Sequence, residues 1–262
     1  MYLRLDNIEK SYPGSQEPAL KSLNLNIKRR QILALLGESG SGKSTLLKII
    51  AAKTQYDKGD YLIDEIAVEE KRVEMMNSIE GIDYLDQESD VPSFISIRDA
   101  LQRKLINYEN SWSKRRIKKL IKILRLEGFE TKKPEELSGG QRQRAALAIT
   151  LAAEPEVILL DEAFTSMDFQ LKHQIQLDLF EFIRDQNMTA IVVTHDPNDA
   201  LMFADKIAVM RKGKIIQKGN PFKIYNKPRT KYTAELFGLV NKFNENDKEN
   251  YIRPEKVKIS SK

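Results

Sequence analysis

The chain of 262 residues contains no cysteine, which excludes disulfide bonds and thiolate metal sites. No apolar run approaches the length needed to cross a bilayer, and residues 1–6 lack the apolar segment of a signal peptide. Internal repeats and low-complexity tracts are absent as well. These absences predict a protein of a reducing compartment, and we expect it in the cytoplasm.

Length and net charge only weakly restrict the number of domains and the type of ligand. The length suits one large domain, or one domain with an appendage. A net charge of +5 is compatible with a polyanionic ligand or an anionic membrane surface, but so mild an excess usually serves solubility.

The most informative stretch covers residues 32–45. Five apolar residues at 32–36 predict a fully buried strand, and residues 43–53 predict a helix. Between them the chain fits G-x-x-x-x-G-K-[ST], whose backbone N–H groups cradle phosphates at a helix N-terminus. Lys43 would reach the β- and γ-phosphates, and the Ser44 hydroxyl would ligate Mg²⁺. The predicted phosphate loop comprises Gly37, Glu38, Ser39, Gly40, Ser41, Gly42, Lys43, Ser44 and Thr45.

The segments around this stretch predict an antiparallel layer. Residues 2–9 predict a strand, and residues 22–28 alternate apolar and polar side chains as a half-buried strand does. A turn at 57–60 leads into a third strand at 61–63.

Residues 96–153 predict helices. Ile117, Leu120, Ile121 and Leu124 have the i, i+3, i+4, i+7 spacing of one helix face. Seven basic residues lie between 114 and 125, and we interpret them as a solvated face opposite the apolar stripe. A nucleic-acid or membrane surface is the alternative interpretation.

From residue 157 onward, strands and helices alternate. Buried strands are predicted at 157–160 and 189–194, a helix face at 171–183, and a closing hairpin at 206–218. This alternation predicts a parallel sheet covered on both faces, and such sheets bind ligands at the carboxyl ends of their strands. Gly37, Asp161 and His195 each follow such an end, so we expect them to converge.

Two carboxylates, Asp161 and Glu162, close the strand at 157–160. Burying such groups is costly unless a cation or a function holds them. We expect Asp161 to hold Mg²⁺, directly or through water, and Glu162 to orient or deprotonate an attacking water.

Residues 137–141 read LSGGQ and precede an Ala-rich helix predicted at 142–153. Ser138 with Gln141 three residues later predicts a capping box. Gly139 and Gly140 are poor helix residues, but glycines at a helix start let another molecule's phosphates approach the backbone closely.

In this order, GESGSGKST, LSGGQ and VILLDE resemble the ATP-binding-cassette (ABC) ATPase family, and specifically a transporter's nucleotide-binding subunit. The resemblance covers nearly the whole chain. It implies an α/β fold with a P-loop NTPase (RecA-like) core, an N-terminal antiparallel β layer and an inserted helical subdomain. The implied cassette covers 1–225, with its core at 1–90 and 156–225 and its helical subdomain at about 91–155.

The resemblance also implies an ATPase with ATP and Mg²⁺ as ligands, and it assigns further roles. Tyr12 matches the aromatic residue that stacks on adenine. Gln87 resembles the glutamine that contacts Mg²⁺ or the attacking water and relays to the membrane partner. His195 resembles the switch histidine at the γ-phosphate. Asp168 resembles the loop that crosses the dimer, although Ser166-Met167 stands where Ala-Leu is commoner. The implied catalytic set is Lys43, Gln87, Glu162 and His195, and the implied Mg²⁺ ligands are Ser44, Gln87 and Asp161.

The implied mechanism needs partners. Two copies, or one copy and a homologous cassette, pair head to tail on ATP. The phosphate loop of one faces Ser138, Gly139, Gly140 and Gln141 of the other.

A membrane-spanning permease would dock near residues 87–101, with Phe94 as an exposed apolar anchor. The alternative for Phe94 is a buried residue at a helix start. A substrate-binding protein is a further partner, nucleic acid is not expected, and the location is peripheral on the cytoplasmic face of the cell membrane.

The C-terminal part refines the resemblance. Residues 224–228 and 234–238 resemble the closing segment of importers of ferric iron, polyamines, sulfate or sugars. We expect residues 226–262 to be a short extension, a remnant of an appended β-domain. Within it, 241–250 predict a mobile link, and 252–255 resemble one strand of that domain.

Other functions share part of this pattern. A regulator of a non-transport membrane complex, as in cell division, would carry the same catalytic motifs. A soluble ABC ATPase acting on nucleic acid or ribosomes usually has two cassettes or a long coiled-coil insertion, and this sequence has neither. An exporter subunit is a further alternative, against which the C-terminal resemblance argues.

Overall fold

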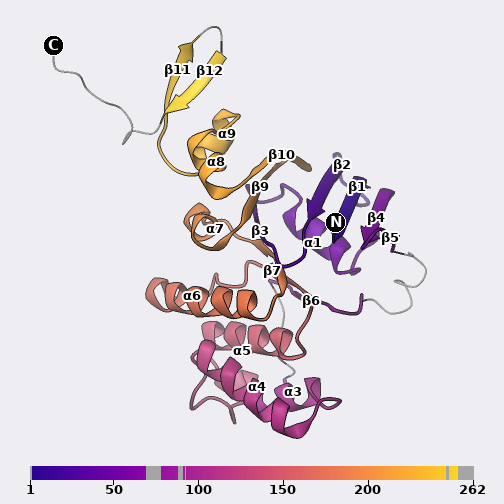
Figure 1. Ribbon diagram of the computed structural model, residues 1–262, viewed down its shortest axis with the longest axis vertical. Helices are drawn as coiled ribbons and strands as arrows, with labels where there is room; N and C mark the ends of the chain where they lie inside the picture. Colours follow the sequence, from indigo (N-terminus) through magenta and orange to yellow (C-terminus); the bar gives the residue numbers. More distant parts are fainter. Residues whose placement is uncertain (1, 69–77, 88–90, 92, 246–247, 253–262) are drawn as a thin grey trace, which may run out of the picture.

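The computed structural model describes residues 2–68, 78–87, 91, 93–245 and 248–252 (Figure 1). Its described strands form two larger sheets and one separate hairpin. None of the described helices is long and apolar enough to span a membrane.

The larger sheet holds the candidate site. Its strand order is β10-β9-β3-β8-β7-β6, and all neighbouring pairs are parallel except the β9–β10 hairpin. The strands are β3 (Ile32–Leu36), β6 (Ile82–Leu85), β7 (Val157–Asp161), β8 (Thr189–Val193), β9 (Lys206–Arg211) and β10 (Lys214–Gly219). Val193 of β8 pairs with Leu35 on one side and with Asp161 on the other. The predicted parallel sheet is therefore confirmed, and its strands end at one common edge.

Both faces of this sheet are covered, because alternate residues of each strand point to opposite sides. Ile32, Ala34 and Leu36 face a core built with α5 (Gly139–Ala152), α6 (Phe169–Asp185) and α7 (Pro197–Phe203). Leu33 and Leu35 face a second core built with α1 (Lys43–Ile50) and the other sheet.

Helix α1 is shorter than the predicted range of 43–53. It ends at Ile50, and Ala52 adopts a left-handed backbone with φ of 58°, which a helix cannot continue through.

The smaller sheet has the order β2-β1-β4-β5 and is antiparallel, as expected. Its strands are β1 (Leu3–Lys10), β2 (Leu20–Ile27), β4 (Lys58–Ile63) and β5 (Ile66–Ala67). The predicted turn at 57–60 is wrong in part, because β4 already begins at Lys58. The pairing of β4 with β1 shifts in register between Asp6 and Glu9, and Glu9 is the partner of Lys58 at this start.

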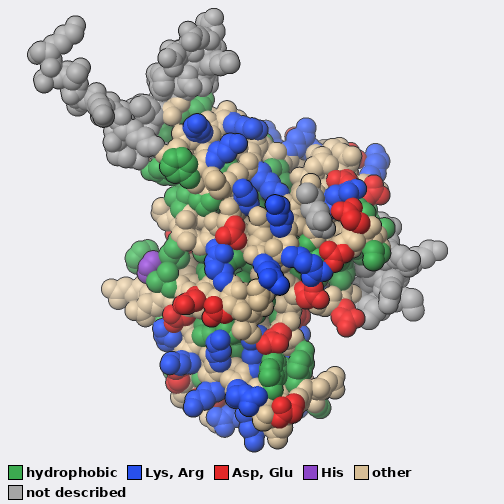
Figure 2. Space-filling view, viewed as in Figure 1, with side chains coloured by type: hydrophobic (Ala, Val, Ile, Leu, Met, Phe, Trp, Pro, Cys, Tyr) green, Lys and Arg blue, Asp and Glu red, His purple; other side chains and the backbone are tan. Residues whose placement is uncertain are grey.

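Helices α3 (Ile97–Lys104) and α4 (Asn110–Ile123) form a helical lobe below the sheets in Figure 1, and α5 joins this lobe to the core of the parallel sheet. The short helix η1 (Pro134–Glu136) leads into α5. Leu120, Ile121 and Leu124 of the predicted stripe are buried in the lobe. Figure 2 shows Lys and Arg side chains gathered on the outside of this lobe. Arg116 differs from that solvated set: it is buried, donates to the Leu151 carbonyl at 2.7 Å, and pairs with Glu154 at 3.3 Å.

The C-terminal part begins with α8 (Pro221–Asn226) and α9 (Lys231–Glu235) and continues into β11 (Asn241–Glu245) and β12 (Lys248–Ile252). The prediction of a mobile link at 241–250 is wrong, because β11 and β12 pair as an antiparallel hairpin from Asn241–Ile252 to Glu245–Lys248. Backbone hydrogen bonds make this pairing, and a polar composition does not reveal them. Residues 253–255 of the predicted strand lie outside the described residues.

Candidate active site

The phosphate loop occupies the turn between β3 and α1 at the carboxyl edge of the parallel sheet. Gly42 is the N-cap of α1 and has a φ of 101°, a conformation that a side chain would strain. Gly42 has no side chain to cap this helix, and among the described residues the first N–H groups of α1 remain available to a ligand. A glycine at this position therefore serves both the turn and an anion-binding helix start.

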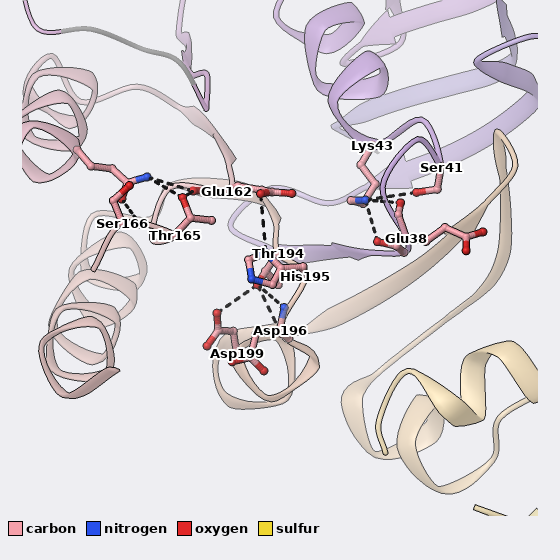
Figure 3. Close-up of polar contacts among 12 residues, drawn as sticks. Glu38, Ser41, Lys43, Glu162, Thr165, Ser166, Thr194, His195, Asp196 and Asp199 are labelled. Carbon is pink, nitrogen blue, oxygen red and sulfur yellow. Dashed lines mark hydrogen bonds and ion pairs between the residues drawn. The ribbon is translucent and has the colours of Figure 1, made fainter. Parts of the chain in front are cut away.

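Lys43 lies folded against its own loop (Figure 3). Its side chain is 6% exposed, and its ammonium donates to the carbonyls of Gly37 and Glu38, each at 2.8 Å. Burial lowers the pKa of Lys43, while the nearby carboxylates of Glu162 and Asp161 act in the opposite direction. A cation held in this way can move to a phosphate, which offers stronger charge-assisted hydrogen bonds than two carbonyls do.

Asp161 ends β7 and is 1% exposed. Burial raises the pKa of this carboxyl, and hydrogen bonds from the Ser44 and Tyr84 hydroxyls oppose that rise. The Tyr84 hydroxyl donates to Oδ2 at 3.2 Å, whereas Oδ1 has no hydrogen-bond partner within the described part of the chain.

This buried carboxylate oxygen beside a serine hydroxyl fits a divalent cation. The described residues contain no group of three or more His, Cys, Asp or Glu that could form a metal cage. An open arrangement is what Mg²⁺ prefers, since it keeps several waters and takes phosphate oxygens as further ligands.

Glu162 follows Asp161 and has the left-handed backbone, with φ of 51°. A residue other than glycine or asparagine is strained in the left-handed backbone region, and such strain is common at functional sites. The His195 Nδ1 lies 3.8 Å from Glu162 Oε2, and the two residues line a hollow of about 180 Å³ together with Thr194 and Phe169. In Figure 3, His195 lies below Glu162, and Lys43 lies to the right of Glu162.

The loop that carries His195 is fixed by its neighbours. The buried Thr194 hydroxyl donates to Asp199 at 3.2 Å and accepts from the Asp196 N–H at 3.1 Å. Lys172 of α6 pairs with Asp199 at 2.8 Å. His195 itself remains 65% exposed, so its imidazole faces open space above the sheet edge.

Two predicted contact residues lie at the margin of this edge. Gln87 follows β6 by two residues and is exposed. Tyr12 is 40% exposed in a turn closed by a hydrogen bond from the Ser15 N–H to its carbonyl. Lys10 approaches the Tyr12 ring at 5.6 Å. Both side chains are accessible, and their predicted contacts with nucleotide stay predictions.

Ser138 caps α5 with the predicted reciprocal hydrogen bonds to Gln141, at 3.3 Å and 2.8 Å. The two glycines between them differ. A Cβ on Gly139 would meet nothing within 4 Å, whereas one on Gly140 would lie 2.8 Å from the Ser166 carbonyl oxygen. A glycine is therefore required at position 140 by packing within the chain, whereas the space at Gly139 is open to another molecule.

Asp168 is the N-cap of α6 and accepts from the Leu171 N–H at 3.0 Å. The loop before it is joined to α5 by Gln143. The Gln143 side chain donates to the Glu162 carbonyl at 3.2 Å and accepts from the Ser166 N–H at 3.1 Å. Sequence reasoning gave Gln143 and Tyr84 no role, because neither belongs to a local pattern and both act through contacts between distant segments.

Phe94 is 88% exposed just before α3, as the anchor hypothesis expects and the buried alternative does not. Its role in docking stays a prediction. Residues 88–90 and 92 of the predicted docking segment lie outside the described residues.

Comparison with known proteins gives one family. The family model described as "ABC transporter" matches residues 20–165. The chain is 35% identical over 247 residues to the putrescine transport ATP-binding protein PotG of Escherichia coli K12, a match that covers 92% of this chain and 63% of PotG. It is 36% identical to the sulfate/thiosulfate import ATP-binding protein CysA of Mesostigma viride, covering 99% of this chain and 74% of CysA. The chain thus spans about two thirds of the length of such relatives.

Solved structures agree with these matches. A dimeric structure of a post-hydrolysis state of the ATP-binding cassette MJ0796, bound to ADP and phosphate, superposes with a TM-score of 0.74. The identity is 29%, and the match covers 84% of this chain and 98% of that cassette.

Proposed function

Because this chain belongs to the ABC transporter family, we propose that it is the ATP-hydrolysing nucleotide-binding subunit of an importer. The observation that most supports this proposal is the meeting of Lys43, Asp161, Glu162 and His195 at one edge of the sheet. Import is supported by relatives that are named for putrescine transport and for sulfate and thiosulfate import.

Nucleotide binding would use the phosphate loop. The free N–H groups at the start of α1 and the Lys43 ammonium would take the β- and γ-phosphates, and Lys43 would exchange its two carbonyl partners for phosphate oxygens. The accessible ring of Tyr12 would stack on adenine.

Ser44, Asp161 and Gln87 would hold Mg²⁺, which neutralises phosphate charge when bound. The unpartnered Oδ1 of Asp161 supports this assignment for the described part of the chain. Tyr84 would fix the other carboxylate oxygen and so orient the one that faces the metal.

Hydrolysis would depend on Glu162 and His195. The Glu162 carboxylate would orient the attacking water and accept its proton. The His195 imidazole, 3.8 Å from that carboxylate, would donate a hydrogen bond to the γ-phosphate and keep it in line with the water.

Each complete site would need two copies of the chain, or one copy and a homologous cassette. The open space at Gly139 supports this, since a Cβ there would meet nothing of the described chain within 4 Å and another molecule could approach. The dimeric MJ0796 cassette, similar to this chain over most of its length, supports the same arrangement. Asp168 would lie where the two copies cross.

Coupling to transport would take place at residues 87–101. The exposed Phe94 would insert into a permease subunit, and the protein would therefore sit at the cytoplasmic face of a membrane. A substrate-binding protein would complete the importer.

Glu162→Gln tests the proposal. We expect MgATP binding to persist and hydrolysis to fall by about 10²- to 10⁴-fold, because the amide cannot accept a proton. Glu181→Gln, an exposed position of α6, is the matched control and should leave turnover unchanged. Unchanged turnover in Glu162→Gln would contradict the assigned base, and absence of ATP binding by the unaltered chain would contradict the proposed function as a whole.

A further inference from the structure

A tyrosine from the C-terminal part of the chain contacts the phosphate loop. The Glu38 N–H donates to the Tyr232 hydroxyl at 2.8 Å, between residues 194 positions apart in the sequence. Arg211, at the end of β9, lies 4.5 Å over the Tyr232 ring and 3.8 Å from the Glu38 carboxylate. Both the backbone and the side chain of Glu38 are therefore held from outside the loop.

Tyr232 is itself firmly placed. Its neighbours in α9, Thr233 and Ala234, are fully buried. The segment before α9 is fastened to β10 by the buried Gln217, which donates to the Lys227 carbonyl at 3.0 Å and accepts from the Arg229 N–H at 2.8 Å. The hydroxyl thus comes from a rigid support rather than from a free terminus.

A second contact holds the other end of the loop. The Gly213 N–H, in the turn between β9 and β10, donates to the Ser41 carbonyl at 3.1 Å. The outer side of the loop is therefore braced at Glu38 and at Ser41, while its inner side faces Lys43 and the sheet edge. A hydrogen bond that fixes a loop before its ligand arrives reduces the ordering cost of binding.

We propose that Tyr232 is a positioning residue for the phosphate loop: its hydroxyl, supported by α9, holds the Glu38 N–H and keeps the first turn of the loop in one conformation before nucleotide binds. The effect on binding rests on the proposed role of this loop in holding ATP. Tyr232 touches no phosphate and acts only through the loop backbone.

The test compares Tyr232→Phe with Tyr108→Phe in the full chain. The control loses a hydrogen bond of similar length, from the Tyr108 hydroxyl to the Ala153 carbonyl at 2.9 Å, in the helical lobe. Calorimetric titration gives the Kd for ADP, steady-state kinetics give KM and kcat for ATP, and hydrogen exchange of the nucleotide-free protein reports on the Glu38 amide.

For Tyr232→Phe we expect the Kd for ADP and the KM for ATP to rise about 3- to 10-fold, the size expected for one lost hydrogen bond. We expect kcat to stay within about twofold, because binding before the chemical step is what weakens. The Glu38 amide should exchange faster than in the unaltered chain, and Tyr108→Phe should change none of these quantities.

Unchanged affinity with unchanged Glu38 exchange would overturn the inference, and so would equal losses of affinity in the two variants. If the unaltered chain bound neither ADP nor ATP, the proposed function would fail. The exchange of the Glu38 amide would then still decide whether Tyr232 holds the loop.

Discussion

The phosphate-loop edge and the LSGGQ segment are built in opposite ways. At the edge, Lys43 and Asp161 are almost fully buried, and one carboxylate oxygen of Asp161 has no hydrogen-bond partner in the described part of the chain. The LSGGQ segment is already satisfied by its own capping box, and Gly139 opens onto solvent. One region contains a buried carboxylate oxygen without a hydrogen-bond partner in the described part of the chain, and the other presents an exposed, capped helix start.

This difference indicates that the two regions have different roles: the phosphate-loop edge binds a ligand, and the LSGGQ segment contacts another molecule. A buried lysine and a buried carboxylate cost free energy in the isolated chain, so they make sense only where a ligand binds. An exposed, self-capped helix start costs nothing in the isolated chain and becomes useful only when another molecule approaches it.

Lys43→Ala should have the largest effect on the edge. We expect ATP affinity to fall about 10- to 100-fold, because charge-assisted hydrogen bonds to the phosphates are lost. The fold should persist, since burial disfavours the charged lysine in the nucleotide-free chain. Titration with ATP measures the effect, with Lys53→Ala, an exposed lysine beyond α1, as control. Unaltered ATP affinity would contradict the role of Lys43 and the phosphate-loop edge in nucleotide binding.

Gly139→Asp should affect the LSGGQ segment alone. We expect ATP binding to a single copy to stay unchanged and hydrolysis to drop about tenfold or more, because the new carboxylate would repel the phosphates held by the other copy. The open space at this position and its place in the first turn of α5 should preserve stability.

Gly140→Ala tests the structural difference between the two glycines. Its Cβ would lie 2.8 Å from the Ser166 carbonyl oxygen, so it should lower the thermal midpoint as well as turnover. If Gly139→Asp destabilised the chain and Gly140→Ala did not, the structural distinction between the two glycines would be wrong.

Asp161→Asn should have the smallest effect, on stability without nucleotide. Because burial raises the folded-state pKa of Asp161, the stabilisation tied to its proton is present below the unfolded pKa and is lost as pH rises through the folded value. The amide avoids that loss, so at pH 7 we expect a midpoint about 2 °C higher than that of the unaltered chain. The gap should close toward pH 4, near the pKa of about 3.9 expected for an unfolded aspartate.

The exposed variant Asp185→Asn is the control for the pH series. A lower midpoint for Asp161→Asn at pH 7 would show that the Ser44 and Tyr84 hydrogen bonds outweigh the burial of the charge. With MgATP added, the unaltered chain should regain the advantage, because its carboxylate can then meet a cation.

Much of this architecture is readable in the sequence. Five-residue apolar strands such as Ile32–Leu36 alternate with amphipathic helices, and that pattern alone predicted the covered parallel sheet. The carboxyl ends of such strands share one edge, which predicted that Asp161 and His195 would lie close to the phosphate loop. The capping box of Ser138 and Gln141 is a local signal, and it is confirmed.

Contacts between distant segments could not be predicted from the sequence. Gln143, Tyr84 and Tyr232 act on loops far away in the sequence, and no periodicity marks such partners. Arg116 lies among exposed lysines and is buried only because the end of α5 offers it carbonyls. The hairpin of β11 and β12 escaped prediction because backbone pairing holds it and the sequence there is polar.

The central claim is that each site combines the phosphate loop of one copy with the LSGGQ segment of another. It is tested most directly by mixing Lys43→Ala protein with Gly139→Asp protein, each nearly inactive alone. A mixed pair contains one site with an intact loop and an intact LSGGQ segment, so we predict ATPase activity well above the sum of the separate activities, up to about a quarter of the unaltered level if pairing is random. Activity that never exceeds that sum, although the two variants form mixed pairs, would contradict the account.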